Sequence, residues 1–314
     1  MKLGMVFPGQ GSQSVGMLRE FVDQHAVARD TFTEASDALG YDLGAMMLEG
    51  PEADLNRTQN TQPAVLVAAV ASWRVWCEAG GPRPELLAGH SVGEFTALVC
   101  ADALPFSEAV RFVHERGKCM QAAVPEGEGA VAAILGLEDA DVSAACTAAA
   151  QDEVVSAVNF NAPGQVVIAG HVGAVERALE AAKASGARKA MILPVSVPVH
   201  CKLMEAPGAE LEPVINQLTL SSPTIPIVHN VDVATHTSAE EIRAVLKPHV
   251  YSPVPWTRTI QMMASAGVDT IVECGPGRIL AGLIKRIDRS VQTQTVFDEA
   301  SLAKALAATG DANG

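Results

Sequence analysis

Aromatic side chains are scarce in this sequence, at 4% of 314 residues, so the core must consist mostly of Ala, Val, Leu and Ile. Basic residues are outnumbered as well, with 22 Lys and Arg against 36 Asp and Glu, a formal net charge of -14. This balance argues against nucleic acid or an anionic membrane surface as partner, since both attract basic faces. It says little about small anionic substrates, which respond to local charges.

Cysteine pairs and long apolar runs are also missing. The six cysteines show no CxxC pair and no metal-ligand spacing, and four lie in apolar stretches, so we expect buried free thiols and no metal. The N-terminal apolar run ends at Pro8 and Gly9, which is too short for a signal peptide. Charges or Gly and Pro interrupt every other apolar run before it could span a membrane. We therefore expect a cytoplasmic protein.

Strand-like and helix-like segments alternate along most of the chain. Short apolar runs predict strands at Leu3–Phe7, Leu86–Ala88, Ile225–His229 and Thr270–Cys274. Helical periodicity predicts helices at Gln62–Ala79, Val92–Cys100 and Ser107–Val124. Ser107 is the expected N-cap of the last of these helices. Such alternation is typical of an α/β fold with a mostly parallel sheet covered by helices on both faces.

The middle of the chain has a different order, β-α-β-β-α-β. Its predicted elements are a strand at Ala130–Leu135, a helix at Ala140–Ala150, strands at Val154–Asn159 and Gln165–Ala169, a helix at Val172–Ser185 and a strand at Lys189–Val195. A tight turn is expected at Asn161–Gly164. We predict a ferredoxin-like small subdomain over residues 127–197, inserted into a larger domain formed by residues 1–126 and 198–314.

The sequence Gly89-His90-Ser91-Val92-Gly93 fits a nucleophile elbow. It contains G-x-S-x-G directly between a predicted strand and a predicted helix. A serine on such a sharp turn has strained backbone angles, and glycines two positions away avoid collisions. The turn also directs the N-terminus of the helix at the hydroxyl, where main-chain amides can stabilise an oxyanion. Ser91 is therefore the candidate nucleophile.

A serine nucleophile needs a general base within hydrogen-bond reach. Among the eight histidines, His200 stands out because Pro198 forces extended backbone just before it, at the end of the small subdomain. His90 adjoins the nucleophile and is expected to support the turn instead. A lone histidine is more often structural than catalytic. The sequence offers no obvious Asp or Glu as a third member, and a backbone carbonyl could fix the imidazole tautomer instead.

An arginine interrupts the apolar face of the helix predicted at Ser107–Val124. Ala109, Val113, Arg116 and Met120 follow one another at helical spacing and share this face. A buried guanidinium without a partner would be costly. Arg116 could form a structural ion pair or reach water, or it could bind the carboxylate of a ligand with its fork of donors. The residues alone do not decide between these interpretations.

The whole set of motifs resembles one family over nearly the full chain. The residues that carry the resemblance are Phe7–Gln13, Gln62–Ala64, Gly89–Glu94, Glu115–Gly117, Asn159–Asn161 with Pro163–Gln165, Val197–His200, Ser252–Val254 with Trp256, and Gly275–Gly277. In this respect the sequence is similar to the malonyl-CoA:acyl carrier protein transacylases of bacterial fatty-acid synthesis. The resemblance implies a large α/β-hydrolase-like domain and a ferredoxin-like insertion.

The resemblance also implies roles for individual residues. Ser91 would be acylated by malonyl-CoA, and His200, oriented by main-chain carbonyls near residues 251–253, would act as its base. The main-chain amides of Gln10 and Val92 would form the oxyanion hole. Arg116 would bind the malonyl carboxylate. The other residues expected to bind substrate are Gln62, Asn161, Met120 and Val199.

Two positions depart from the family pattern. Val199 stands where relatives often have Ser or Phe, which leaves the fine shape of the acyl pocket open. His249 stands where Gln is common, and since a backbone carbonyl has the role there, we expect little change. Neither departure alters the expected reaction class.

The implied reaction is a ping-pong transfer of malonyl to the phosphopantetheine thiol of holo-acyl carrier protein, which supplies fatty-acid chain elongation. Both halves exchange thioester and oxyester, so no metal or redox cofactor is expected. Carrier proteins are acidic, as this chain is, so docking would require a local basic patch. The candidates for that patch are Arg188, Lys189, Lys285, Arg286 and Arg289. The expected oligomeric state is a monomer.

Two other interpretations are open. A serine hydrolase could use the same elbow, but it would usually need a triad acid and would not explain Arg116. A binding module without catalysis could retain the fold, yet Ser91, His200 and Arg116 are all present. The sequence does not decide whether methylmalonyl or other acyl groups are accepted.

Overall fold

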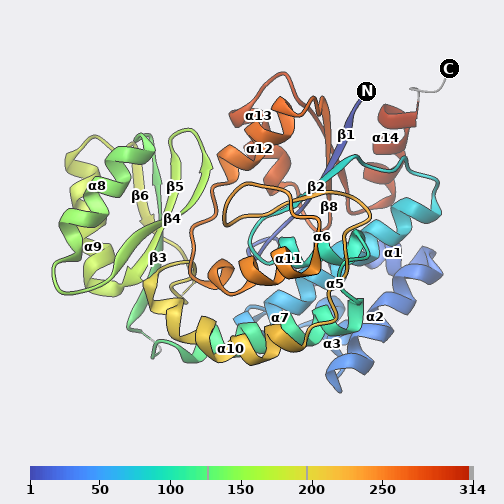
Figure 1. The fold of residues 1–314 in the computed structure, drawn as a ribbon, viewed down its shortest axis with the longest axis horizontal. Helices are drawn as coiled ribbons and strands as arrows, with labels where there is room; N and C mark the ends of the chain where they lie inside the picture. The colour runs from blue at the N-terminus through green and yellow to red at the C-terminus, as the bar shows by residue number, and fades with distance from the viewer. Residues whose placement is uncertain (126, 196, 311–314) are drawn as a thin grey trace.

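Two β-sheets lie side by side in the computed structural model, which describes residues 1–125, 127–195 and 197–310 (Figure 1). The larger sheet has the order β7-β2-β1-β8-β9, and every pairing in it is parallel. Its strands are β1 (Leu3–Phe7), β2 (Leu86–Gly89), β7 (Ile227–Val228), β8 (Thr270–Cys274) and β9 (Gln292–Val296). β1, β2 and β8 are buried at every position, as expected for apolar strands covered on both faces.

Helices surround the large sheet. Those before the small sheet are α1 (Arg19–Gln24), α2 (Ala26–Leu39), α3 (Leu43–Glu49), α4 (Glu52–Leu55), α5 (Thr58–Glu78), α6 (Gly93–Cys100) and α7 (Phe106–Ala122). Those after it are η1 (Lys202–Met204), α10 (Glu205–Gln217), α11 (Ala239–Leu246), η2 (Pro248–Val250), α12 (Trp256–Ser265), α13 (Ile279–Ile287) and α14 (Glu299–Gly310). Within the described residues, no helix combines the length and apolar character needed to cross a membrane.

The smaller sheet is antiparallel and has the order β4-β5-β3-β6. Its elements in chain order are β3 (Gly129–Leu135), α8 (Asp139–Ala150), β4 (Val155–Ala162), β5 (Gln165–His171), α9 (Val172–Ala184) and β6 (Lys189–Ile192). The small sheet lies with α8 and α9 at the left of Figure 1. Apolar side chains of these two helices pack with the sheet in a core of their own. The two central strands are joined by a tight turn in which Gly164 has a φ of 68°, a conformation that favours glycine.

The observed architecture confirms the predicted α/β fold class and the order β-α-β-β-α-β in the middle. One local prediction was wrong, because Ser107 is not the N-cap of α7. Pro105 has this position with extended backbone, and Ser107 already lies in the first turn. The division of the chain after residues 126 and 197 stays a prediction, and residues 126 and 196 lie outside the described residues.

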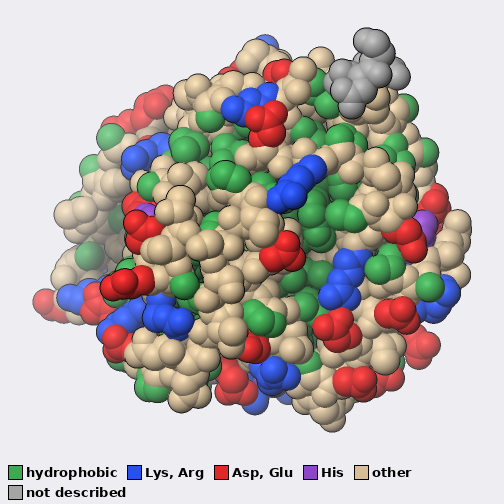
Figure 2. Space-filling model, turned by 45° about the vertical axis from the view of Figure 1, so that its right-hand side comes forward, with side chains coloured by type: hydrophobic (Ala, Val, Ile, Leu, Met, Phe, Trp, Pro, Cys, Tyr) green, Lys and Arg blue, Asp and Glu red, His purple; other side chains and the backbone are tan. Residues whose placement is uncertain are grey.

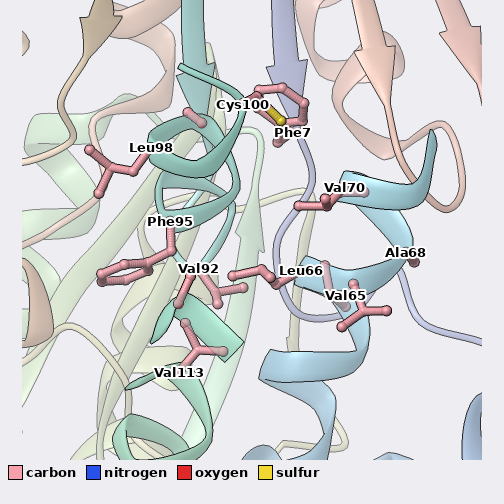
Figure 3. Close-up of a cluster of buried hydrophobic side chains, with 14 of the residues drawn as sticks. Phe7, Val65, Leu66, Ala68, Val70, Val92, Phe95, Leu98, Cys100 and Val113 are labelled. Atoms are coloured by element: carbon pink, nitrogen blue, oxygen red, sulfur yellow. The ribbon is translucent and has the colours of Figure 1, made fainter. Parts of the chain in front are cut away.

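A buried core connects the large sheet to the helices that carry the candidate site. Figure 3 shows Phe7 of β1 and Leu66 of α5 in this core, together with Phe95 of α6 and Val113 of α7. All four side chains are essentially inaccessible to solvent. Because α5, α6 and α7 pack in one core with β1, the end of β1 and the start of α6 are held at fixed positions relative to α5 and α7.

Candidate active site

The elbow predicted at Ser91 is present, between β2 and α6. Ser91 has a φ of 52°, in the left-handed region that non-glycine residues seldom adopt. A Cβ on Gly89 would lie 1.9 Å from the carbonyl carbon of Gly93, and a Cβ on Gly93 would lie 2.3 Å from the Phe7 carbonyl oxygen. Both positions therefore require glycine, and the sharp turn depends on them.

His200 lies beside the nucleophile, although 109 residues separate the two in the sequence. Ser91 Oγ and His200 Nε2 are 2.6 Å apart, and His200 Nδ1 lies 3.0 Å from the Ser252 carbonyl oxygen. Because a carbonyl can only accept, Nδ1 carries the proton and Nε2 is free to accept one from the Ser91 hydroxyl. The loop that contains Ser252 is held by Val254, which exchanges main-chain hydrogen bonds with β4.

His200 is 1% exposed, and its electrostatic surroundings keep it neutral. Burial holds the pKa of His200 well below its usual value of 6.5, and the positive charge of Arg116 and the nearby His249 and His90 lower it further. A neutral imidazole at physiological pH is the form that can take a proton from Ser91.

A cavity of about 210 Å³ opens onto Ser91 and His200 between the two sheets. Its wall on the large sheet includes the loop after β1, and its wall on the small sheet includes apolar side chains. The lining residues are Pro8, Gly9, Gln10, Ser12, Gln62, His90, Ser91, Val92, Arg116, Val131, Asn159, Asn161, Val167, Leu193, Val195, Val199, His200, Ile279, Leu280 and Leu283. The cavity is therefore mostly apolar, with a few polar groups that converge on the serine.

Arg116 is a buried cation in the wall of this cavity, 1% exposed. Nη1 donates to Gln62 Oε1 at 2.6 Å, whereas Nε and Nη2 have no hydrogen-bond partner among the described residues. Burial lowers the pKa of Arg116 to about 10, and Glu94 partly offsets this, so the group stays charged near neutral pH. A ligand carboxylate could accept hydrogen bonds from both of these donors and so bind the buried guanidinium bidentately.

Gly117 brings Arg116 to Gln62. A Cβ at position 117 would lie 2.5 Å from Gln59 Cα and 2.7 Å from the Thr58 carbonyl oxygen. Because Gly117 has no side chain, α7 can lie directly against α5. This contact places Arg116 of α7 beside Gln62 of α5 in the cavity wall.

Two main-chain amides are available beside the serine. Gln10 follows β1 and Val92 precedes α6, and both residues line the cavity. Across the described residues, neither N–H group donates a hydrogen bond to a protein acceptor. Since β1 and β2 are adjacent parallel strands, their carboxyl ends bring these amides to the same edge of the sheet.

The other expected substrate-binding residues divide into two groups. Asn161 and Val199 line the cavity, and Asn161 Oδ1 lies 2.8 Å from His90 Nε2. Met120 does not form part of the cavity wall. It lies behind Gln62, with its sulfur 3.5 Å from Gln62 Nε2, so the Met120 side chain contacts Gln62 and not the open cavity.

The five basic residues of the expected docking patch are exposed but do not form one cluster. Arg286 donates to the Gln165 side chain at the start of β5, near the end of the small sheet that carries Arg188 and Lys189. Lys285 and Arg289 instead lie together beside β9. On the face shown in Figure 2, acidic and basic side chains are interspersed among the described residues.

A buried polar network beneath the elbow was not foreseen from the sequence. The Glu94 carboxylate accepts from the Asn230 main-chain N–H at 2.7 Å and lies 2.8 Å from His229 Nδ1. His249 Nε2 is 3.5 Å from the same carboxylate. Although burial opposes ionisation, the two histidines and these hydrogen bonds hold the pKa of Glu94 below its usual value. The only signal in the sequence was an acidic residue directly after the elbow, inside an otherwise apolar helix.

Comparison with known proteins identifies the family. Residues 5–304 match the family described as "Acyl transferase domain". This chain belongs to the acyl transferase family. The acyltransferase is 52% identical over 305 residues to the malonyl CoA-acyl carrier protein transacylase of Salmonella typhimurium, with 97% of this chain and 99% of that protein covered. The family match and the names of these relatives support an acyltransferase enzyme.

Solved structures of relatives agree with the fold of the acyltransferase. An acyl carrier protein S-malonyltransferase from Vibrio cholerae is 51% identical and superposes with a TM-score of 0.94, over 97% of this chain and 99% of that chain. A malonyl-transacylase solved with its type II PKS acyl-carrier protein is also 51% identical, with a TM-score of 0.97 over 98% of this chain and 100% of that chain.

Proposed function

We propose that this acyltransferase moves a malonyl group from malonyl-CoA to the phosphopantetheine thiol of an acyl carrier protein, through a malonyl ester on Ser91. The observation that carries the proposal is the pair of free donors on Arg116, in the same cavity as the bonded Ser91 and His200. A cation with an open fork favours an acyl group that ends in a carboxylate. The names of the relatives support the same substrate.

In the first half-reaction, Ser91 Oγ attacks the thioester carbonyl while its proton passes to His200 Nε2. Hydrogen bonds from the main-chain N–H groups of Gln10 and Val92 stabilise the negative charge that develops on the carbonyl oxygen. When the tetrahedral intermediate collapses, the carbon–sulfur bond breaks and His200 returns the proton to the departing CoA thiolate. The product is an ester between Ser91 and the malonyl group.

In the second half-reaction, the phosphopantetheine thiol gives its proton to His200 and attacks the ester carbonyl. The carbon–oxygen bond breaks, and His200 returns the proton to Ser91 Oγ. Both halves exchange one ester for another without a change in oxidation state, so the proposed chemistry requires neither a metal nor a redox cofactor. Coenzyme A enters as part of a substrate.

Selection for malonyl rests on Arg116, with Gln62 as its fixed partner. A malonyl carboxylate would satisfy Nε and Nη2, whereas an acetyl group would leave them unpaired in a dry site. Asn161 and Val199 are proposed to bound the acyl chamber, since both line the cavity near Ser91. Met120 is proposed to act only through Gln62, as its contact with that side chain suggests.

Docking of the carrier protein is proposed to use Arg188, Lys189 and Arg286 at the end of the small sheet, with Lys285 of α13 and Arg289, which follows this helix, beside β9. Charge reversal at Arg188, Lys189 and Arg286 should slow transfer to the carrier and leave acylation by malonyl-CoA intact, because rim charges act mainly on association. An equal loss in both half-reactions would refute this role. Charge reversal of Arg111, an exposed residue of α7, is the matched control.

The proposed function is tested by initial rates and by the lifetime of the acyl-enzyme. A transferase should give parallel double-reciprocal plots with malonyl-CoA and holo-acyl carrier protein, and an acyl-enzyme stable in the absence of the carrier. Intersecting plots would contradict the ping-pong order. Rapid loss of malonate to water without transfer would favour a hydrolase, the second function that an elbow of this kind supports.

The remaining expectations stay predictions. The cytoplasmic location and the monomeric state rest on the sequence alone. We propose fatty-acid elongation as the pathway supplied, since the relatives with high identity carry names of malonyl transfer to acyl carrier protein.

A further inference from the structure

Asn230 lies directly beneath the nucleophile elbow, in the loop that follows β7. Its side-chain amide connects two main-chain groups on either side of His90. Asn230 Oδ1 accepts from the Ser91 N–H at 2.9 Å, and Asn230 Nδ2 donates to the Gly89 carbonyl at 2.7 Å. The residue is 1% exposed. A single amide therefore bridges the turn that carries the nucleophile, with one acceptor and one donor both in use.

The bridge is itself anchored to the helix that the elbow begins. Glu94, in the first turn of α6, accepts the Asn230 main-chain N–H at 2.7 Å and also lies 2.8 Å from His229 Nδ1. Glu94 and His229 are completely buried. In consequence, buried hydrogen bonds to the Glu94 carboxylate tie the start of α6 to the loop after β7, and the neutral Asn230 amide extends this network to the end of β2.

The elbow needs such a support because its conformation is strained. Ser91 has a positive φ of 52°, and strained backbone of this kind persists only where the surroundings fix it. A relaxation of the turn would move Ser91 Oγ away from His200 Nε2, which it meets at 2.6 Å. The same relaxation would turn the Val92 amide away from the cavity, since Val92 is the next residue along the turn.

We propose that Asn230 is a positioning residue for the nucleophile. Its amide holds the Gly89 carbonyl and the Ser91 N–H at a fixed separation, so that the hydroxyl stays in line with His200 and the Val92 amide faces the cavity. Glu94 fixes Asn230 in turn. This inference rests on the proposed acylation of Ser91, and it identifies which buried residue keeps that serine reactive.

The first test removes the bridge. In Asn230→Ala the main-chain bond to Glu94 remains, while both side-chain bonds to the elbow disappear. We expect kcat of acylation by malonyl-CoA to fall about 10- to 100-fold with KM nearly unchanged, since small displacements of reacting groups cost about this much. A fluorophosphonate, which reacts with an activated serine whatever its natural acyl donor, should label the variant more slowly by a similar factor.

The fluorophosphonate separates failure of this inference from failure of the proposed function. If the unmodified protein is labelled at Ser91 but does not transfer malonyl, the proposed substrate is wrong and the comparison with Asn230→Ala still holds. Labelling of Asn230→Ala at the unmodified rate would overturn the positioning role. A variant that loses only thermal stability, with the labelling rate kept, would overturn it equally.

The second test uses Asn230→Asp, which keeps the shape of the side chain. When the introduced carboxyl is protonated it can donate to the Gly89 carbonyl, and when it is ionised it cannot. Burial and the Glu94 carboxylate from α6 both raise the pKa of a carboxyl at this position. We therefore expect the labelling rate of this variant to rise severalfold as the pH is lowered from 8 to 6.

The unmodified protein should show no such rise. The other titratable groups around Asn230 and the elbow are His229 beside it, His249 from η2, His200, His90 and, through Glu94, Arg116 from α7. All are present in both proteins, so a rise confined to Asn230→Asp comes from the introduced carboxyl. If the labelling rate of Asn230→Asp stayed flat or fell toward pH 6, the inference would be overturned.

Asn60→Asp provides the matched control. Asn60 is 8% exposed and also bridges two groups, donating to the Asp54 carbonyl at 2.9 Å and accepting from the Tyr41 hydroxyl at 3.3 Å. It supports α5 without touching the elbow. Asn60→Asp should therefore lower stability and leave the pH profile of Ser91 labelling as in the unmodified protein. A rise on acidification in this control as well would remove the specific role of Asn230.

Discussion

Removal of the Arg116 guanidinium should abolish the preference for malonyl over acetyl. The guanidinium uses Nη1 on Gln62 and keeps Nε and Nη2 free. A hydrogen bond to a charged group contributes about 1.5–3 kcal/mol, so two such bonds to a malonyl carboxylate amount to about 3–6 kcal/mol. At about 1.4 kcal/mol per tenfold, this corresponds to a preference of about 10²- to 10⁴-fold.

The assay is the acylation half-reaction, measured as the ratio of kcat/KM for malonyl-CoA to that for acetyl-CoA. In Arg116→Ala this ratio should fall by about 10²- to 10⁴-fold, because malonyl loses both bonds. Acylation by acetyl-CoA should not fall, since an acetyl group has no carboxylate to bind the guanidinium. Measurement at pH 8 keeps His200 neutral in both proteins, so the comparison reports recognition alone.

Arg74→Ala is the matched control. Arg74 is partly buried and, like Arg116, hydrogen-bonded, to Thr31 and Glu34 at 2.9 Å each, but it lies away from the cavity. Its removal should lower stability and leave the ratio unchanged. If the ratio in Arg116→Ala stayed within about threefold of the unmodified protein, Arg116 would be a structural cation and the proposed recognition would be refuted.

Three further predictions follow from burial and close packing. Burial raises the pKa of Glu273 to about 7, so between pH 4.5 and 7 the unfolded chain loses a proton that the folded protein keeps. Urea titrations should therefore show the free energy of unfolding falling by about 3 kcal/mol as the pH rises across this window. Glu273→Gln should show no such decline. Because the pKa of His200 lies well below 6.5, acylation by acetyl-CoA should stay level as the pH is lowered through 6.5, and an inflection at 6.5 or above would disprove the neutral buried base. Gly117→Ala should lower the free energy of unfolding by about 1–3 kcal/mol, because the new methyl group forces α7 away from α5. A Cβ at Gly282 meets no atom within 4 Å, so Gly282→Ala should raise the free energy of unfolding by up to about 1 kcal/mol. Equal changes in the two variants would contradict the close approach of α7 and α5.

Much of the fold could be predicted because the relevant signals are local. The strands at Leu3–Phe7 and Thr270–Cys274 have the predicted bounds, since each is a short apolar run between turns. The strand expected at Ile225–His229 is reduced to two residues, because Pro226 cannot donate to the sheet. β9 was missed because four consecutive polar residues, at 292–295, make up most of this edge strand and leave no apolar run or alternation to detect.

The candidate site could be predicted only in part. The G-x-S-x-G pattern identifies Ser91 locally, whereas the contact between Ser91 and His200 depends on how two distant segments pack. The apolar stripe of α7 placed Arg116 on the face of the helix directed at the core, but it showed neither that Arg116 is fully buried nor that Gln62 takes one of its donors. Asn230 gave no local signal, because it lies 139 residues after Ser91, in the loop that follows a strand paired with β2.

The central claim is that Ser91 carries a malonyl group on its way to a carrier protein. The most direct measurement is the intact mass of the protein after incubation with malonyl-CoA, compared with Ser91→Ala, and again after holo-acyl carrier protein is added. We predict one malonyl group on the unmodified protein, none on Ser91→Ala, and its appearance on the carrier. A malonyl adduct that persists in Ser91→Ala, or one that never reaches the carrier, would contradict the account.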